Sequence, residues 1–425
     1  MIDKQNIKQI IGERQEELLS IQIVERPMQF DRSSNYVLIG PRRAGKSYML
    51  YWYLQQLIKN KGASIQQILY INFEDERIAL IQAHELGILL EAYQEMYPTE
   101  KPWIFLDEIQ NIVGWEKFAR RLADSKYHVM ITGSNAKMLS SEIATTLGGR
   151  YIAREVFPFS FAEYLTYCGL TLQPNWEYMP AQRLQVKNKI TSYLQYGGFA
   201  ETFDKADKRE WLNSLYQKII MGDIVERNAI RNPRVFRLLA RKLADSVMQP
   251  TSIARLQHLI ISTGDRISIP ILKDYLDYMR EAYLVFEIPN LASHLAEQAT
   301  AKKRYFIDNG ILNLFLHNDV AKLLENIVAI HLHKKYTNND EYRLFYYNRG
   351  VEVDFCIPEE SLAIQVSYNM DDITTAERET NALLKFTKQY PEYKGIIITY
   401  DTEKELEING QVIHIIPLWK WLIQQ

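Results

Sequence analysis

The stretch GPRRAGKS at residues 40–47 decides the fold of the first part of this chain. It fits the pattern G-x-x-x-x-G-K-[ST], follows the apolar run YVLIG (36–40) and opens a helical pattern at Lys46. Glycines at these spacings let the backbone wrap phosphate groups, whose charge is bound by the amides and by the helix N-terminus. We therefore expect a phosphate-binding loop between a strand and a helix.

This loop predicts a nucleotide site that also holds a metal. Lys46 should reach the β- and γ-phosphates, and Ser47 should place its hydroxyl on Mg²⁺. ATP and Mg²⁺ are the expected cofactors, although nothing in the stretch separates ATP from GTP. The residues expected to bind the nucleotide are Gly40, Pro41, Arg42, Arg43, Ala44, Gly45, Lys46 and Ser47.

A second stretch, WIFLDEIQ at 103–110, supplies two carboxylates. Its apolar run predicts a buried strand, and in open α/β sheets ligands bind where the strands end. We assign Asp107 to the Mg²⁺ shell and Glu108 to polarising the attacking water, two roles that phosphoryl transfer requires. One predicted strand separates this stretch from the loop, which indicates the branch of P-loop ATPases with a catalytic glutamate.

The next predicted strand, HVMITGSN at 128–135, ends in polar residues. Asn135, with Thr132 and Ser134, is a candidate sensor that touches the γ-phosphate or orients water. An ordinary strand-end turn is the alternative, because Gly-Ser-Asn is common turn chemistry. The acidic run EDE at 74–76 fits a solvated loop at least as well as a role in the site.

Composition restricts the class of protein. The chain has 425 residues, 47% of them apolar, so we expect two to four domains. The net charge of −2 gives no overall attraction to nucleic acid or to anionic membranes. The two cysteines lack metal-ligand spacing, the N-terminus lacks an apolar signal segment, and no apolar run reaches the ~18 residues of a membrane span. We expect a soluble, cytoplasmic protein without membrane contact.

The order of patterns along the chain predicts an α/β fold in four parts. Residues 1–158 combine an amphipathic helix (4–20) with a P-loop NTPase parallel sheet, because five short apolar runs alternate with helical patterns. Residues 159–230 predict a helical extension, and residues 231–291 predict a winged helix-turn-helix. A polar stretch at 292–303 predicts a loop, after which residues 304–425 return to α/β.

With these motifs in place, the sequence resembles a large group of prokaryotic AAA-type ATPases. GPRRAGKS, INFEDER, IFLDEIQ, ITGSN and LGGR occur in this order, followed by GDIVER, YLDYMREAYLVFEI, KKRYFIDNGI, LLENIV, EVDF and IPLWKWL. The resemblance covers nearly the whole chain. It implies a C-terminal winged helix and then a domain similar to restriction endonucleases of the PD-(D/E)XK type.

The resemblance also implies a nuclease site, from which this sequence departs. Glu325 and Asp354 match the first two acids of that site, but Gln365 and Ser367 stand where an acid and a lysine are expected. Because metal-dependent hydrolysis needs this negative charge, we expect a folded but catalytically inactive domain. His331 and His333 lie two residues apart on the same predicted helix, and therefore on different faces of it. We expect them to form a solvated helix surface and not a pair of metal ligands.

The predicted winged helix leaves its partner open between DNA and protein. Its second helix, SIPILKDYLDYMREAY (268–283), carries two basic and three acidic residues, whereas helices that read bases present Arg, Lys, Asn or Gln. Basic residues at near-helical spacing precede it and could touch phosphates or form a solvated face: Arg231, Arg234, Arg237, Arg241 and Lys242.

Arg150, in LGGRY, is the candidate arginine finger. AAA-type ATPases often supply an arginine from this region to the γ-phosphate of a neighbouring subunit, where it stabilises charge in the transition state. Arg150 could instead be a surface residue or a partner of Glu155. Three other cations compete for the role: Arg154, Arg42 and Arg43.

Together these features favour an ATP-hydrolysing switch or motor of the AAA type that acts on an unidentified partner. A homo-oligomer would suit a finger supplied by a neighbouring subunit. The alternative is an ATP-regulated nucleic-acid-processing enzyme, and a third reading is a binding module that nucleotide merely stabilises. The departure at Gln365 and Ser367 argues against the nucleic-acid-processing enzyme, and the intact set of Lys46, Asp107 and Glu108 argues against the binding module.

Overall fold

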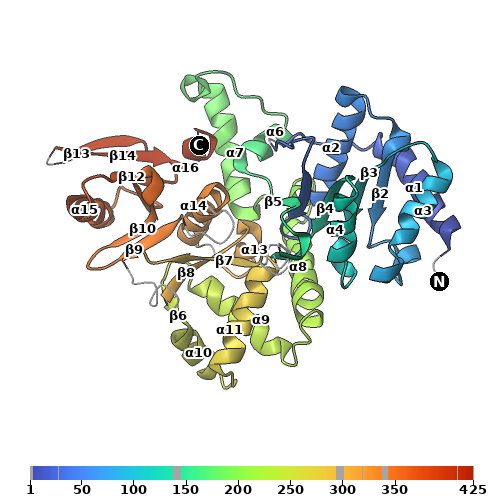
Figure 1. Cartoon of the computed structure of the whole chain (residues 1–425). Helices are drawn as coiled ribbons and strands as arrows, with labels where there is room; N and C mark the ends of the chain where they lie inside the picture. Colours follow the sequence, from blue (N-terminus) through green and yellow to red (C-terminus); the bar gives the residue numbers. More distant parts are fainter. Residues whose placement is uncertain are drawn as a thin grey trace. The chain divides into compact units, whose positions relative to one another are not determined.

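The computed structural model describes residues 3–26, 28–136, 145–292, 301–317, 319–336, 343–408 and 410–424. The chain divides into two compact units, Met1–Phe157 and Pro158–Gln425 (Figure 1). Among the described residues, no helix combines the length and apolar character needed to cross a membrane.

The first unit is built on one parallel sheet with the strand order β2-β3-β4-β1-β5. Its strands coincide with the five apolar runs, so the predicted parallel sheet is confirmed. They are β1 (Asn35–Ile39), β2 (Ile68–Asn72), β3 (Trp103–Asp107), β4 (His128–Gly133) and β5 (Tyr151–Glu155). The helices of this unit are α1 (Lys4–Leu18), α2 (Lys46–Lys61), α3 (Gly87–Met96) and α4 (Glu116–Asp124), with short 3₁₀ turns η1 (Ile65–Gln67), η2 (Glu76–Ile78), η3 (Ala83–Glu85) and η4 (Ile109–Asn111).

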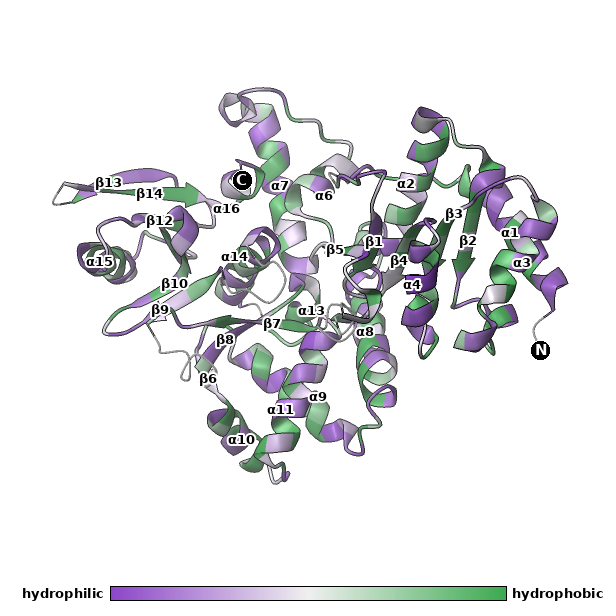
Figure 2. Ribbon diagram, in the orientation of Figure 1, coloured by the Kyte–Doolittle hydropathy of each residue, from purple (hydrophilic) through white to green (hydrophobic). Residues whose placement is uncertain are grey.

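Burial on both faces explains why β1, β2, β3 and β4 are nearly continuous apolar runs, whereas the half-exposed edge strand β5 ends in Arg154 and Glu155. Leu50, Leu54 and Leu57 of α2 pack in one core cluster with Leu38 of β1 and Phe105 of β3. Figure 2 shows β2 and β3 in the hydrophobic colour. A sheet covered by helices needs this composition, because neither of its faces meets water.

Strand order positions the candidate site. β4 lies between β1 and β3, with Thr132 opposite Leu38 and Ile131 opposite Leu106. The three strands run in the same direction, so the loop after β1 and the carboxylates at the end of β3 meet the end of β4 at one edge of the sheet.

The second unit begins with helices and continues into a small antiparallel sheet. The helices are α6 (Phe161–Tyr167), α7 (Pro180–Tyr196), α8 (Lys208–Lys218) and a π-helix, η8 (Ile219–Glu226), with 3₁₀ turns η6 (Trp176–Tyr178) and η7 (Ala200–Thr202). They are followed by α9 (Pro233–Asp245), β6 (Thr251–Ser252), α10 (Ile253–Ile261), α11 (Ile269–Glu281), β7 (Val285–Pro289) and β8 (Ala301–Phe306). The three strands pair in the order β6-β8-β7.

The rest of the second unit is a mixed sheet with the order β13-β14-β12-β11-β10-β9. β11, β12 and β14 are parallel, and the strands at both ends pair antiparallel. The elements are α13 (Asn309–Asn313), α14 (Val320–Tyr336), β9 (Phe345–Asn348), β10 (Glu352–Ile357), η9 (Pro358–Glu360), β11 (Leu362–Ser367), α15 (Ile373–Gln389), β12 (Lys394–Thr399), β13 (Lys404–Ile408), β14 (Gln411–Pro417) and α16 (Leu418–Gln424).

Three strands of the second unit were not predicted: the two-residue β6, and the longer β8 and β13. Residues 301–303, expected in a loop, belong to β8, whose charged side chains concealed the strand; Lys302 and Arg304 bind Glu287 of β7 at 2.7 Å each. β13 is an exposed edge strand of sequence KELEI, drawn in the hydrophilic colour in Figure 2. Apolar runs reveal buried strands, so both of these polar strands were missed.

Candidate functional site

Backbone conformation explains the composition of the phosphate-binding loop. Gly40, Arg43 and Gly45 all have positive φ angles of 146°, 62° and 95°, values that favour glycine. A Cβ on Gly40 would lie 2.1 Å from the carbonyl oxygen of Val156. The loop ends at Gly45, where α2 begins with Lys46, so the N-terminal amides of a 16-residue helix follow the loop directly. This arrangement fits a phosphate group.

Lys46 is held over the loop by backbone carbonyls. Its Nζ donates to the carbonyl oxygens of Gly40 at 3.2 Å and Pro41 at 3.0 Å, and lies 3.6 Å from Oε1 of Glu108. The side chain is buried. The ammonium therefore lies between the loop and the second predicted carboxylate.

Asp107 is fully buried and accepts three side-chain hydrogen bonds. Tyr70 donates to its Oδ2 at 2.5 Å, Thr132 donates to Oδ1, and Ser47 also bonds to this carboxylate. Burial raises the pKa of Asp107, although the bonds from Thr132 and Tyr70 oppose the rise. Mg²⁺ prefers oxygen ligands, and here a carboxylate and a hydroxyl come together as that metal requires.

Glu108 has a strained backbone, with φ 54° and ψ 42°. Its N–H donates to Oγ1 of Thr132 at 2.8 Å, and its Oε2 accepts from Nε2 of Gln110 at 2.5 Å. Burial acts to raise the pKa of Glu108, but the charge of Lys46, the bond from Gln110 and the charge of Arg42 together outweigh it and leave the pKa below its ordinary value. Non-glycine residues in this region of φ and ψ concentrate at functional sites, where the strain fixes a side chain.

Thr132 connects the Asp107 carboxylate to the backbone of Glu108. The same hydroxyl donates to Asp107 and accepts from the backbone of Glu108. Asn135, the candidate sensor, is buried two residues after β4 ends. Ser134 accepts a bond from Gln110 at 3.3 Å, so the end of β4 is also bonded to the segment that follows β3.

Two of the remaining candidate cations, Arg42 and Arg150, lie in ion pairs. Arg42 binds Glu74 at 3.1 Å, which ties the acidic run at 74–76 to the loop. Arg150 binds Asp124 of α4 at 2.5 Å and the carbonyl oxygen of Gly148 at 3.0 Å. The local carboxylate bound to Arg150 is therefore Asp124, where we had considered Glu155.

Sequence reasoning missed two residues of the first unit that contact this site. Tyr70, the donor to Asp107, sits in an apolar strand run in which it looked like an ordinary core residue. Arg26 donates from Nη1 to the carbonyl oxygen of Ala44 at 3.1 Å and from Nη2 to that of Phe157 at 3.0 Å. Arg26 precedes β1 in a stretch without periodicity, so no pattern pointed to it.

The second unit buries a lysine among carboxylates. Nζ of Lys303 lies 2.8 Å from Asp354, 3.0 Å from Glu352 and 3.5 Å from Glu325. Burial acts to lower the pKa of Lys303, but these carboxylates outweigh it and raise the pKa well above its ordinary value. Burial and Asp354 raise the pKa of Glu325 to about 7, against the opposing charge of Lys303. Tyr305 adds a bond to Glu325 at 2.6 Å.

Gln365 and Ser367 complete the surroundings of Asp354. Oε1 of Gln365 accepts from the N–H of Asp354 at 3.0 Å, and its Nε2 donates to Glu379 at 2.6 Å. Ser367 bonds to the carbonyl oxygen of Asn369 at 3.2 Å. A lysine does accompany these acids, but it comes from β8, in a stretch that we expected to form a loop.

The prediction that His331 and His333 form a solvated surface is wrong. The ring of His333 stacks on Phe286 at 4.1 Å, and the ring of His331 packs against Trp421 at 4.7 Å. Burial lowers the pKa of His331 to about 4 and that of His333 to about 3. The helix is covered on both sides by other elements of the second unit, which the sequence of α14 alone could not show.

A family model agrees with the nucleotide-binding geometry of the first unit. Residues 32–165 match the model of an AAA domain, and residues 187–322 and 321–421 match two domains of unknown function. Among solved structures, the chain is similar to the Walker-type ATPase PABY2304 of Pyrococcus abyssi, with 15% identity, a TM-score of 0.40, and coverage of 74% of this chain and 96% of that one. The Orc1 protein of Aeropyrum pernix, solved in complex with DNA, gives 14% identity, a TM-score of 0.28, and coverage of 77% and 94%.

Two curated relatives match over almost their whole length. An uncharacterized protein of Haemophilus influenzae is 30% identical over 400 residues, covering 91% of this chain and 94% of the relative. The uncharacterized protein MJ1544 of Methanocaldococcus jannaschii is 31% identical over 436 residues, covering 99% of this chain and 96% of the relative. The chain therefore belongs to the family of AAA-domain proteins that includes MJ1544.

Proposed function

We propose that this protein is a Mg²⁺-dependent ATPase that works as a switch or motor on a partner. One observation carries the proposal: Lys46, Asp107 and Glu108 meet at one sheet edge, where the Thr132 hydroxyl donates to the Asp107 carboxylate and accepts from the backbone N–H of Glu108. Phosphoryl transfer depends mainly on positioning and on charge stabilisation, and these residues supply both.

Each residue then has a distinct role. The loop amides and Lys46 bind the phosphates, while Ser47 and Asp107 hold the metal. When bound, Mg²⁺ neutralises charge on the phosphate oxygens. Glu108, whose pKa Lys46, Gln110 and Arg42 together hold below its ordinary value, attracts the proton of the attacking water. Phosphates that draw Lys46 away from its 3.6 Å contact with Glu108 would leave this carboxylate available to the water.

Two substitutions test these roles. Lys46→Ala should abolish or greatly weaken nucleotide binding, because it removes the charge that meets the β- and γ-phosphates. Glu108→Gln should bind ATP but fail to turn it over, since the metal ligands stay intact. Glu116→Gln, a nearby carboxylate in α4, serves as the matched control. Fluorescent-nucleotide titration and phosphate release separate the outcomes, and normal turnover by the Glu108 variant would remove its assigned role.

We also propose Asn135 as the sensor and Arg150 as an arginine finger that acts in a neighbouring subunit. For Arg150 the ion pair with Asp124 would have to exchange for the γ-phosphate. Arg150→Ala should keep ATP affinity within a few-fold and reduce turnover by about 10³ or more. Mixing it with Lys46→Ala should restore some activity, because each variant supplies what the other lacks. Normal turnover by Arg150→Ala would exclude the finger.

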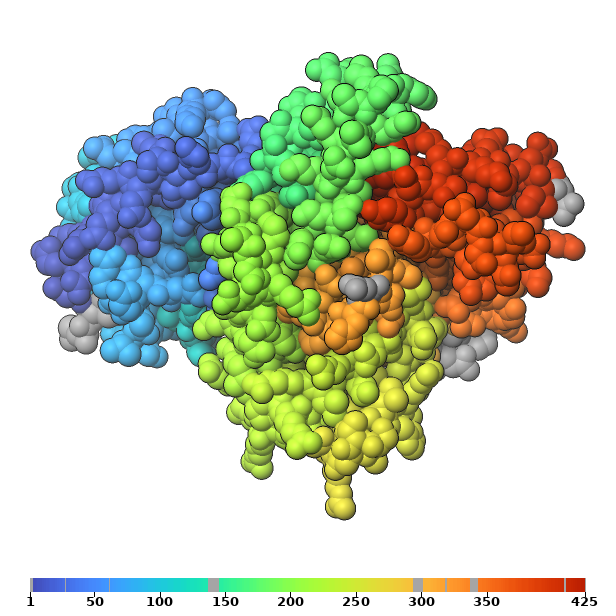
Figure 3. Space-filling view, turned by 180° about the vertical axis from the view of Figure 1, so that it is seen from behind, coloured from blue at the N-terminus to red at the C-terminus, as the bar shows by residue number. Residues whose placement is uncertain are grey.

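For the partner, we propose that residues 231–291 form a winged helix. Its order of α9, β6, α10, α11 and β7, with β8 closing the small sheet, supports this reading. Figure 3 shows this segment, in yellow-green to yellow, at the surface of the face drawn. The exposed side of α11 mixes apolar, acidic and basic side chains; it carries Ile269, Ile271, Lys273, Asp274, Asp277 and Arg280.

The two aspartates and two isoleucines on that surface favour a protein partner over DNA, because base-reading helices present basic or amide side chains and Arg280 is paired with Asp277 at 2.9 Å. Duplex DNA should therefore leave the rate of ATP hydrolysis unchanged at low salt. Stimulation that disappears in Arg231→Ala and Arg241→Ala, two exposed positions next to or within α9, would reverse this assignment.

We propose that residues 304–425 form a restriction-endonuclease-like domain without nuclease activity. In support, Lys303 already occupies the space among Glu325, Glu352 and Asp354, and Gln365 contributes a neutral amide. A metal would have to displace this ammonium. No cleavage of DNA or RNA is expected with Mg²⁺ or Mn²⁺, with or without ATP. Cleavage that is lost in Asp354→Ala would establish the alternative function, an ATP-regulated nuclease.

A further inference from the structure

The last residues of the first unit are tied to the phosphate-binding loop. The N–H of Val156 donates to the carbonyl oxygen of Ile39 at 2.7 Å, immediately before the loop. Arg26 then joins two carbonyl oxygens, that of Ala44 inside the loop at 3.1 Å and that of Phe157 at 3.0 Å. Because the guanidinium is a rigid planar fork, a shift of one carbonyl changes the bond to the other.

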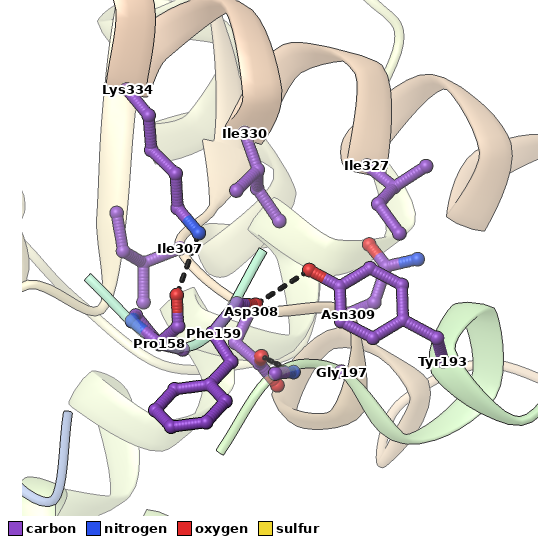
Figure 4. A pocket seen from close by; sticks show the side chains of 11 residues that line it. Pro158, Phe159, Tyr193, Gly197, Ile307, Asp308, Asn309, Ile327, Ile330 and Lys334 are labelled. Atoms are coloured by element: carbon purple, nitrogen blue, oxygen red, sulfur yellow. Dashed lines mark hydrogen bonds between the residues drawn. The ribbon is translucent and has the colours of Figure 1, made fainter. Parts of the chain in front are cut away.

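The first residues of the second unit are tied just as closely. The carbonyl oxygen of Pro158 accepts from Nζ of Lys334 at 2.7 Å, and the N–H of Phe159 donates to the carbonyl oxygen of Gly198 at 2.7 Å. The carbonyl oxygen of Phe159 accepts from the hydroxyl of Tyr193 at 2.7 Å. Figure 4 shows Lys334 and Tyr193 reaching toward this short segment around a small pocket.

Asp308 extends these bonds into the second unit. Its buried carboxylate accepts from the backbone N–H of Gly198 at 2.7 Å, of Gly310 at 2.8 Å and of Ile311 at 3.3 Å. A Cβ on Gly197 would lie 2.1 Å from Asp308, and a Cβ on Gly198 would lie 2.1 Å from the carbonyl oxygen of Phe159. We refer to Asp308 and its three N–H donors as the Asp308 network.

We propose that residues 156–159 are a coupling segment through which nucleotide binding at the loop changes the Asp308 network, with Arg26 as the positioning residue. The inference rests on the proposed nucleotide function. Four residues span at most about 14 Å, and hydrogen bonds hold this segment on both sides of the joint between the units.

The coupling between the nucleotide site and the Asp308 network is reciprocal, so it can be measured at either of the two sites. If nucleotide binding alters the Asp308 network, the network must alter nucleotide affinity by the same factor. The three N–H donors to Asp308 report the state of the network through their hydrogen exchange. Burial raises the pKa of Asp308 to about 6, so its carboxylate is ionised at the pH of 7.5 chosen for the measurement.

The experiment is hydrogen exchange of the full chain, read by mass spectrometry over residues 196–199 and 308–312. It compares the protein alone with the protein saturated by Mg²⁺ and a non-hydrolysable ATP analogue. In the wild type, exchange in both segments should change by about fivefold or more on saturation. Arg26→Ala and Lys334→Met should lose this change even when saturated, whereas Lys335→Met, the adjacent residue of α14, should retain it.

Two results would overturn the coupling. One is an unchanged exchange rate in the wild type while fluorescent titration shows the analogue bound. The other is a full change in both Arg26→Ala and Lys334→Met. If Arg26→Ala does not fold, Arg26→Lys replaces it, because a single ammonium cannot reproduce the fork between two carbonyls. Absence of analogue binding by the wild type would instead refute the proposed function, and the coupling with it.

Discussion

Removing the buried charge of Lys303 tests how the second unit is stabilised. The ammonium is fully buried, 2.8 Å from Asp354 and 3.5 Å from Glu325, and both of these carboxylates are almost inaccessible to water. The third contact, to Glu352, is 43% exposed and should contribute little. Lys303→Met leaves two buried carboxylates without a counter-charge, and breaking a buried pair in this way costs about 3–5 kcal/mol.

The sign of the pH dependence follows from the same carboxylates. The pKa of Glu325 is already raised to about 7 although Lys303 opposes the rise, so it should rise further in the variant. An acid whose pKa is higher in the folded than in the unfolded state gains stability as the pH falls from the folded pKa toward the unfolded value. The loss of stability in Lys303→Met should therefore be smaller at pH 5.5 than at pH 8.

Urea unfolding, followed through the tryptophans of the second unit, measures this loss. Lys322→Met is the matched control, because Lys322 belongs to the same helix as Glu325 and forms an exposed pair with Asp319 at 3.3 Å. It should cost about 0.5 kcal/mol or less. The double variant Lys303→Met with Glu325→Gln should recover part of the loss. A cost below about 1 kcal/mol for Lys303→Met, or no recovery in the double variant, would refute the reasoning.

Three further predictions follow from single contacts. Thr132→Val removes the hydroxyl shared by Asp107 and the backbone of Glu108, so turnover should fall by about 10–100-fold while ATP affinity stays within a few-fold; phosphate release and nucleotide titration check this. The folded pKa of His331 is about 4 and its unfolded pKa is 6.5, so the stability that its neutral ring provides is lost as the pH falls below 6.5. When the pH is lowered from 7 to 5, urea unfolding should show that the wild type loses about 2 kcal/mol more stability than His331→Phe. Gly198→Ala should destabilise the protein by about 1–3 kcal/mol or more, because the added Cβ meets the carbonyl oxygen of Phe159, whereas Gly12→Ala, with open space in α1, should stabilise it by about 0.5–1 kcal/mol in thermal unfolding.

The first unit could be predicted because its signals are local. Each buried strand is one continuous apolar run, and the loop at 40–47 carries its phosphate-binding pattern within eight residues. The positions of Asp107 and Glu108 follow from the strand that precedes them.

Residues whose roles depend on distant partners could not be predicted. Lys303 is 51 positions from Asp354, and its own strand is so rich in charge that it indicated a loop. Tyr70 contacts Asp107 only because β2 and β3 are neighbours in the sheet. The aromatic rings that pack against His331 and His333 belong to other elements of the fold, so the helix considered alone gave the wrong environment for both histidines.

The position of β4 between β1 and β3 sets the width of the site. Adjacent strands lie about 4.8 Å apart, so the end of β1 and the end of β3 are separated by two such spacings, nearly 10 Å. If β1 and β3 were neighbours, the loop and the carboxylates would be about 5 Å apart, without room for a phosphate and a water between them. β4 therefore separates the loop from the carboxylates and also contributes Thr132 to the site. Side chains alternate along a strand, so deleting one residue of β4 before Thr132 would turn its hydroxyl to the opposite face, away from the Asp107 carboxylate and the backbone N–H of Glu108.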